Sequence, residues 1–285
     1  TYKNYYNSCV KERFGDVKID KIKGADIQAF YNDLTKKGRK LSTIKVVKAF
    51  MSSCLKQAVK DELIARNPFD ATSLPRKAGD TMGRIAMTRE EQELFMEYAK
   101  ESFLYNLFAV MLRTGMRSGE ARDLRWSDID KKQNVIHVTR TLQYINGVGF
   151  IDDAPKTKTS IRDIPLTAEV LKLLENQKNY WGFKVEKIDR YLFCDADGNP
   201  INVHLLQAEI DKTVKRIHED GKEFPRITSH VFRHTFATRA IEAGMQPQVL
   251  KTIMGHSSLA MTMDLYSHVL PDTKAEEMQK IANVF

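Results

Sequence analysis

The sequence is poor in cysteine, in long apolar runs and in any leader-like segment. Its cysteines are odd in number and far apart, which favours reduced core thiols over a disulfide framework or a zinc site: Cys9, Cys54 and Cys194. The longest apolar runs, such as residues 107–112, fall far short of the roughly 20 residues that a membrane helix needs. No signal-peptide pattern opens the chain, so we expect a cytoplasmic protein with no membrane partner. The initiator methionine is also missing, which indicates a fragment.

The size of the chain and the distribution of its charge are more informative. A chain of 285 residues exceeds the usual reach of one hydrophobic core, so we predict two domains. Residues 1–79 hold 17 Lys and Arg against 8 Asp and Glu, whereas residues 80–285 hold 28 against 29. A localised basic excess suits a polyanion such as DNA. From charge alone, a solvated basic face that keeps the protein soluble is as well supported as a DNA-binding face.

The N-terminal region carries a helical pattern with a basic side. Ser42 is placed like an N-cap, and apolar residues then recur at spacings of three and four: Ile44, Val47, Met51, Leu55 and Ala58. The other side carries Lys45, Lys48, Lys56 and Lys60. The pattern predicts an amphipathic helix with a basic face.

A change of pattern near residue 80 marks the boundary between the two domains. The stretch around Pro75 and Gly79 has little periodicity and reads as a linker, and Thr88 then opens a capping box. Residues 134–139 alternate like a strand, and residues 161–166 end a second one. We therefore predict a mainly α protein, with a small antiparallel β-sheet and a long connection between its strands in the second domain.

Three segments near the C-terminal end hold residues with possible chemistry. His230 and Arg233 are three positions apart and share a face near a helix N-terminus, where the backbone favours an anion such as phosphate. His256 follows a glycine that ends the next helix, and Tyr266 stands ten residues later. Taken singly, such a tyrosine is usually a core or interface residue and such a histidine is usually structural. Their order and spacing carry the signal.

The pattern His-x-x-Arg, Gly-His and Tyr, preceded by the runs at residues 114–120 and 124–130, resembles the tyrosine recombinase (phage-integrase) family. Within this family, the sequence most resembles integrases of conjugative transposons. The resemblance covers residues 80–285 and implies the tyrosine-recombinase catalytic fold there. Residues 1–79 are similar to the family's helical core-binding domain by pattern and position. Together the two domains would form a clamp around DNA.

The resemblance implies six catalytic residues: Arg117, Lys156, His230, Arg233, His256 and Tyr266. The arginines would clamp the scissile phosphate, because planar guanidinium groups donate bidentate bonds to its non-bridging oxygens. His230 would accept a proton or bind the phosphate. His256 would donate to the phosphate or position Tyr266, whose phenol needs such help to attack.

The general acid for the leaving 5′-oxygen has two candidates. The resemblance favours Lys156, while Lys158 lies two residues away and, in a strand, on the same side. Glu120 would orient an arginine or a histidine. A first-turn carboxylate that merely stabilises its own helix explains Glu120 almost as well.

Other polar residues are interpreted without a catalytic role. Asp152 and Asp153 are adjacent carboxylates in a stretch flanked by Gly and Pro, which favours solvated turn residues over a metal site. His234 and His268 are offset from the proposed catalytic residues, so we expect them on another face, as structural residues. We expect no metal and no cofactor.

The resemblance implies a site-specific recombinase that integrates or excises a mobile element through a 3′-phosphotyrosyl intermediate. No ATP is needed, because one phosphoester replaces another of similar energy. The implied partners are double-stranded DNA, three further copies forming a homo-tetramer on two duplexes, and an excisionase-type accessory protein. The alternatives are a type IB topoisomerase and a non-catalytic DNA-binding accessory protein. The complete set of six residues argues against the last.

The C-terminal segment 272–285 has apolar residues at helical spacing: Ala275, Met278, Ile281, Ala282 and Phe285. A short helix is unstable alone in water, so this stripe must pack against something. Periodicity favours packing on its own domain and packing elsewhere equally. The resemblance favours docking on a neighbouring protomer.

Overall fold

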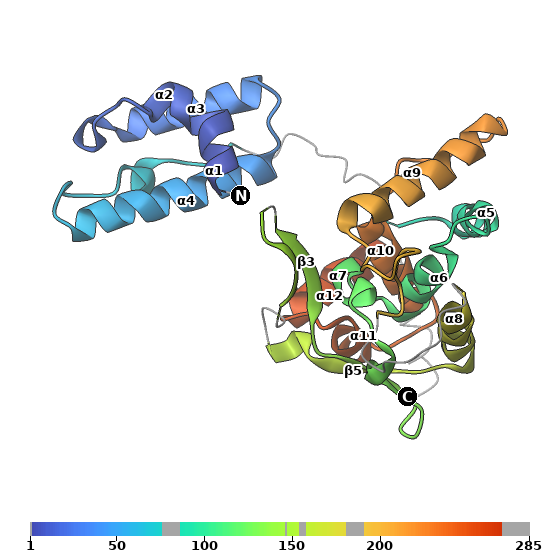
Figure 1. The fold of residues 1–285 in the computed structure, drawn as a ribbon. Helices are drawn as coiled ribbons and strands as arrows, with labels where there is room; N and C mark the ends of the chain where they lie inside the picture. Colours follow the sequence, from blue (N-terminus) through green and yellow to red (C-terminus); the bar gives the residue numbers. More distant parts are fainter. Residues whose placement is uncertain (1, 76–85, 146, 154–157, 181–190, 270–285) are drawn as a thin grey trace, which may run out of the picture. The chain divides into compact units, whose positions relative to one another are not determined.

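A computed structural model of the chain describes residues 2–75, 86–145, 147–153, 158–180 and 191–269. The chain divides into two compact units, Thr1–Gly83 and Arg84–Phe285. Both are mainly helical (Figure 1). Among the residues so described, no helix is both long enough and apolar enough to cross a membrane.

In the first unit, blue to cyan in Figure 1, residues 2–75 form helices and helical turns. It contains α1 (Tyr2–Tyr5), the π-helical turn η1 (Tyr6–Val10), α2 (Lys11–Phe14), the 3₁₀ turn η2 (Ile19–Lys21), α3 (Gly24–Lys36), α4 (Leu41–Lys60) and the 3₁₀ turn η3 (Pro68–Ala71). The apolar stripe predicted on residues 42–60 is buried along α4, which confirms the amphipathic helix. The predicted N-cap is wrong, because Lys40 has the extended backbone of a cap and Ser42 already lies inside the helix.

The second unit surrounds short strands with helices. Its helices are α5 (Arg89–Ala99), α6 (Tyr105–Thr114), α7 (Ser118–Arg122), α8 (Ala168–Asn179), α9 (Val203–Glu219), α10 (Ser229–Glu242), α11 (Pro247–Met254) and α12 (Leu259–Val269). Two 3₁₀ turns are η4 (Trp126–Asp128) and η5 (Lys158–Ser160). The strands are β1 (Ile129–Asp130), β2 (Val135–Val138), β3 (Thr141–Ile145), β4 (Gly149–Asp153) and β5 (Arg162–Pro165). The capping box at Thr88 is present and starts α5, as predicted.

The strands form two small antiparallel sheets. One has the order β1-β2-β5, with Ile136 opposite Ile164 and both buried. This confirms the predicted pairing of residues 134–139 with 161–166. The long connection between them contains a second sheet that the sequence analysis did not predict, the β3–β4 hairpin. In Figure 1 this hairpin projects from the helical body of the unit. The glycines of its turn are also typical of an open loop, so the hairpin is missed when the short strands on either side are not recognised.

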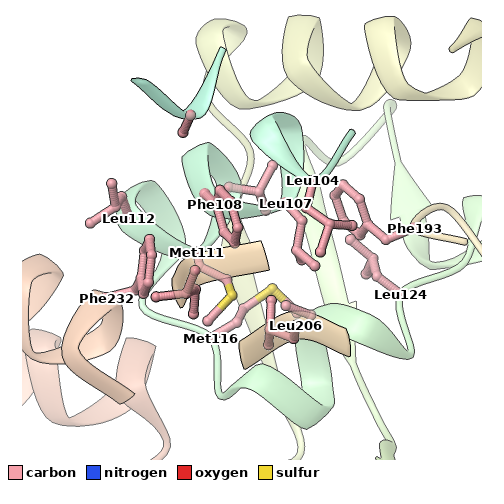
Figure 2. Packing of buried hydrophobic residues seen from close by; sticks show 14 of the residues in the cluster. Leu104, Leu107, Phe108, Met111, Leu112, Met116, Leu124, Phe193, Leu206 and Phe232 are labelled. Atoms are coloured by element: carbon pink, nitrogen blue, oxygen red, sulfur yellow. The ribbon is translucent and has the colours of Figure 1, made fainter. Parts of the chain in front are cut away.

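The core of the second unit is built around α6. Residues 107–112 of this helix are apolar on every side and all buried, as expected of a helix enclosed by other elements. Figure 2 shows side chains of α6 packed against Phe193, Leu206 and Phe232. The Phe108 and Phe232 rings stack with centroids 5.4 Å apart. This packing holds the C-terminal end of α6 beside the first turns of α10, and these two ends carry predicted site residues.

The cysteines are free thiols, as predicted. Cys9 and Cys194 are buried in the cores of their units. Cys54 is exposed, so its predicted core position is wrong. It lies on α4 one residue before Leu55, and a shift of about 100° around a helix moves a side chain away from the buried stripe.

Candidate active site

A glycine turn brings Arg117 to the site. α6 ends at Gly115, whose φ of 63° is left-handed and favours glycine. A Cβ there would lie 2.3 Å from the ring of Phe236 on α10, so the position also needs a residue without a side chain. Two residues later, Arg117 is the N-cap of α7. Its side chain is 37% exposed and therefore open to a ligand.

The C-terminal end of α11 gathers three arginines. The last carbonyls of a helix have no partner inside the helix and carry its negative dipole end, so cations are stabilised there. Each of the last three carbonyls accepts a bond from a different arginine: Ile253 from Arg162 Nε at 2.5 Å, Met254 from Arg233 Nη2 at 2.6 Å and Gly255 from Arg117 Nη2 at 2.9 Å. Two predicted phosphate-binding residues therefore converge on one helix end.

Glu120 neutralises part of this positive charge from a buried position. Its carboxylate accepts bonds of 3.1 and 2.8 Å from Arg162 and a bond of 2.7 Å from Arg117 Nη1. Burial by itself would raise the pKa of Glu120, but the bonds and charges of Arg162 and Arg117 outweigh it and hold the pKa below its usual value. The ionised Glu120 thus fixes the orientation of Arg117.

Arg162 is a site residue to which the sequence analysis assigned no role. It is 7% exposed and links Glu120 to the carbonyls of Ile253 and Ser160. A signal was present: in the strand at 161–166, Arg162 shares the inward face with Ile164. A charged residue on the apolar face of a strand indicates a buried ion pair.

Arg233 lies deeper than Arg117. It is 4% exposed, and its Nη1 donates to the Gly115 carbonyl at 2.7 Å. Burial, and then the charge of Arg117, lower the pKa of Arg233 to about 9. The guanidinium therefore stays protonated at neutral pH, with its planar group held on the turn that carries Arg117.

His230 lies in the first turn of α10, as predicted, and its side chain is exposed. Its ring meets that of His234 edge to face, with centroids 4.9 Å apart. The prediction that His234 faces away is wrong, because residues four apart lie on the same side of a helix. Desolvation and the charges of Arg233 and Arg117 lower the pKa of His230. The burial and the two cations therefore favour the neutral form of the His230 ring.

His256 follows the C-cap glycine of α11 and is buried. Its Nδ1 lies 2.9 Å from the hydroxyl oxygen of Thr262. Burial, and then the charges of Arg233 and Arg117, lower the pKa of His256 to about 4, so the ring is neutral at pH 7. The arginines and His256 therefore form one electrostatically coupled group.

Tyr266 is placed differently from the other predicted residues. It lies on α12 and packs on a small cluster with Leu250 and Met254 of α11. Its hydroxyl donates to the Met245 carbonyl, in the turn between α10 and α11. Within the described residues it shares no hydrogen bond with the arginines or histidines above. Burial raises the pKa of Tyr266, which favours the neutral phenol.

The remaining predicted positions are less informative. Lys156 lies outside the described residues. Lys158 lies in η5 and not in a strand, so the argument that the two lysines share a strand face is wrong. Asp152 is not a turn residue, because it pairs with Arg125 and Tyr191 at the end of β4. The described residues contain no group of three or more His, Cys, Asp or Glu that could hold a metal ion.

Two family models match the chain. Residues 86–272 match the model of the Phage integrase family, and residues 1–35 match the model called Phage integrase, N-terminal SAM-like domain. The transposase from transposon Tn916 of Enterococcus faecalis is 28% identical over 280 residues, which are 95% of this chain and 69% of that protein. The ICEBs1 integrase of Bacillus subtilis is 28% identical over 302 residues, covering 98% of this chain and 77% of that protein.

Solved structures show the same fold. The Tn1549 transposon integrase in complex with a circular intermediate DNA superposes with a TM-score of 0.87 and 30% identity, covering 98% of this chain and 92% of that one. A lambda integrase dimer bound to a core site shares the fold at 19% identity, with a TM-score of 0.67 over 93% of this chain and 87% of that one. The chain therefore belongs to the phage integrase family, and it is a DNA-binding, tyrosine-type site-specific recombinase similar to the integrases of conjugative transposons.

Proposed function

We propose that Arg117 and Arg233 hold the scissile phosphate of a DNA strand while Tyr266 attacks it. The observation that carries the proposal is the convergence of both arginines on the end of α11, next to a neutral His256. The negative charge that develops on a pentacoordinate phosphorus needs preorganised donors, and these groups are preorganised before any ligand binds. Glu120 acts through Arg117 and is a positioning residue.

The arginines keep donors for a phosphate. A guanidinium has five N–H groups, and among the described residues the Arg117 side chain donates to Glu120 and Gly255. One edge of the group is thus anchored to protein, and the rest is available for non-bridging oxygens. Arg233 is anchored in the same way by two carbonyls.

Strand cleavage exchanges one phosphoester bond for another. The phenol oxygen of Tyr266 forms a bond to phosphorus as the bond from phosphorus to the 5′-oxygen breaks, giving a 3′-phosphotyrosyl enzyme. His230 accepts the phenol proton, and His256 donates to a non-bridging oxygen. Lys156 protonates the departing 5′-oxygen, with Lys158 as the alternative. A 5′-hydroxyl of a partner strand then reverses the step and needs no ATP, because one phosphodiester is exchanged for another.

Tyr266 must leave its bond to the Met245 carbonyl before it can attack. We propose that assembly on DNA shifts the end of α12 that carries Tyr266, while Thr262 near its start stays against His256, so that the phenol reaches the phosphate. Segment 272–285, which follows α12 and lies outside the described residues, would dock on a neighbouring protomer and drive this movement. Cleavage would then occur only in an assembled complex.

The two domains have different proposed roles. We propose that residues 1–79 form the core-binding domain, residues 80–285 the catalytic domain, and that they clamp a duplex between them. Exposed lysines on α4 support a role for the first domain on the DNA backbone: Lys45, Lys56 and Lys60. The Tn1549 integrase has been solved with circular intermediate DNA and with transposon right end DNA. We propose that this chain likewise acts on the ends of a mobile element, as a tetramer on two duplexes, with an excisionase-type partner.

A nicked suicide duplex tests the nucleophile, because loss of the short cleaved strand traps the covalent complex. Wild-type protein should form an adduct that survives boiling in detergent, and digestion should map it to Tyr266. Tyr266→Phe should bind the same DNA and form no adduct, since only one hydroxyl is removed. Tyr180→Phe, which alters an exposed tyrosine on the same unit, is the matched control and should cleave normally. An adduct from Tyr266→Phe would place the nucleophile elsewhere.

The products separate recombination from the alternatives. A recombinase joins ends from two different duplexes, whereas a type IB topoisomerase rejoins the same strand and relaxes supercoils. A DNA-binding accessory protein does neither. Joining between duplexes is the expected result.

A further inference from the structure

We propose that Thr262 is a positioning residue that keeps the proton of the His256 ring on Nε2. The inference rests on the donor role proposed above for His256. His256 is 7% exposed and Thr262 is fully buried, and their side chains meet at 2.9 Å through Nδ1 and Oγ1. Because a neutral imidazole carries one proton, the partner of one nitrogen decides what the other nitrogen can do.

The direction of this bond follows from what each group can satisfy. Other buried threonines on the helices of this unit, Thr114 and Thr213, donate their hydroxyl proton to the carbonyl four residues earlier. The Thr262 hydroxyl makes no such bond, and among the described residues its one hydrogen bond is to His256. If Nδ1 carried the proton and donated, the buried Thr262 proton would have no acceptor, which is costly. Thr262 therefore donates, Nδ1 accepts, and Nε2 carries the ring proton.

This tautomer suits the proposed reaction. Nε2 has no hydrogen bond to the described residues, so its N–H is free to donate to a phosphate oxygen. The opposite tautomer would present a lone pair to an anion, and the interaction would be repulsive. Thr262 thus selects the form of His256 that stabilises developing negative charge.

The position of Thr262 also couples this selection to the nucleophile. Thr262 lies on α12 four residues before Tyr266, so the two side chains share a face of the helix. The proton of His256 is therefore held on Nε2 only while the first turn of α12, the helix that also carries Tyr266, is seated against the end of α11.

Nitrogen-15 NMR of the full chain, labelled at histidine, tests the tautomer directly. The His256 ring is identified as the one whose signals vanish in His256→Gln. In wild-type protein at pH 7, the two ring nitrogens should show the pattern of a neutral ring protonated at Nε2. A ring protonated at Nδ1 in the wild type would overturn the inference without any variant at Thr262.

Two variants at position 262 then test the cause. Thr262→Val keeps the shape and removes the hydroxyl, so protonation at Nδ1 should appear and covalent-complex formation on the suicide duplex should slow about tenfold to a hundredfold. Thr262→Ser should restore the Nε2 pattern and most of the rate. Thr213→Val, at an equally buried helical threonine, is the matched control and should change neither.

The outcomes separate this inference from the proposed function. An unchanged Nε2 pattern in Thr262→Val would overturn the role of Thr262. A shifted proton with an unchanged cleavage rate would instead leave the control by Thr262 standing and overturn the donor role of His256.

Discussion

The arginine cluster and the helix that carries Tyr266 differ in how their side chains are held. Arg117, Arg162 and Arg233 are each held by carbonyls at the end of α11, and Glu120 bridges two of them. Tyr266 instead rests on the Met245 carbonyl, outside that network. The difference supports our proposal that the phosphate-binding groups are preorganised in the single chain, whereas Tyr266 is aligned only on assembly. A recombinase needs this order, because cleavage before assembly would break DNA without a partner to join.

The largest expected effect comes from Lys156, which belongs neither to the arginine cluster nor to the helix of Tyr266. Lys156→Ala should slow cleavage of ordinary DNA about a hundredfold or more, because the departing 5′-oxygen lacks its proton donor. A 5′-bridging phosphorothioate should restore the rate, since a thiolate leaves without a proton. Single-turnover cleavage of both substrates is the measurement.

Two further variants serve as a control and as a test of the alternative general acid. Arg117→Ala should lose cleavage on both substrates, because its role is phosphate binding and sulfur cannot replace it. If the sulfur substrate rescues Lys158→Ala and not Lys156→Ala, the general acid is Lys158.

Removal of segment 272–285 tests whether alignment is truly left to assembly. The truncated protein should bind a single site almost normally, because the arginines and the basic helices are untouched. Cooperative synapsis should be lost, and cleavage by isolated protomers should change. Native gels with one and two sites per complex make the measurement. Tetrameric complexes that form as readily as with the full chain would show that the segment packs on its own domain.

Loss of Arg162 tests whether the arginine cluster at the end of α11 is a rigid unit. Arg162→Ala leaves the buried Glu120 with one arginine and removes the bond to the Ile253 carbonyl, so the free energy of unfolding should fall by about 3–5 kcal/mol. Urea denaturation measures it. Arg113→Ala is the matched control, because Arg113 pairs with Glu169 at 3.5 Å on the surface and its loss should change stability by about 1 kcal/mol or less. Equal losses in the two variants would mean that the cluster is not a rigid unit.

The smallest expected effect is a pH dependence from His256. Its pKa is lowered from 6.5 to about 4 in the folded protein, so between these values only the unfolded state takes up the proton. The free energy of unfolding should therefore decrease as pH falls from 6.5 towards 4, by about 2 kcal/mol between pH 7 and pH 5 from this group. Urea midpoints at the two pH values measure it. His256→Gln should remove this part of the dependence, and His204→Gln on the exposed side of α9 should keep it.

Local patterns in the sequence predicted much of the fold because they depend on neighbouring residues. The apolar stripe of α4, the capping box at Thr88 and the glycine that ends α11 are all read within one or two helical turns. The same local reasoning failed at Ser42 and at the β3–β4 hairpin. Ser42 resembles an N-cap in sequence, but a serine caps a helix only where the helix begins. The β3 and β4 strands are too short to show a clear alternation of apolar and polar residues.

By itself the sequence determined the residue types and spacings that indicate the chemistry: His230, Arg233, His256 and Tyr266. Helical periodicity places His230 and Arg233 on one face of a helix, and the order of all four residues resembles the family's pattern. The sequence also placed Arg162 on an inward strand face, but nothing local says what such a residue meets.

Only the tertiary structure decided that three arginines share one helix end and that the Tyr266 hydroxyl bonds to the Met245 carbonyl instead. Arg117 reaches Gly255 across 138 residues, and Arg162 reaches Ile253 across 91. Such contacts follow from how α6, β5, α10 and α11 pack around the core, and many side chains together set that packing. The bonds from Thr262 to His256 and from Tyr266 to Met245 have the same origin: each depends on where α12 is seated, which no residue of α12 specifies alone.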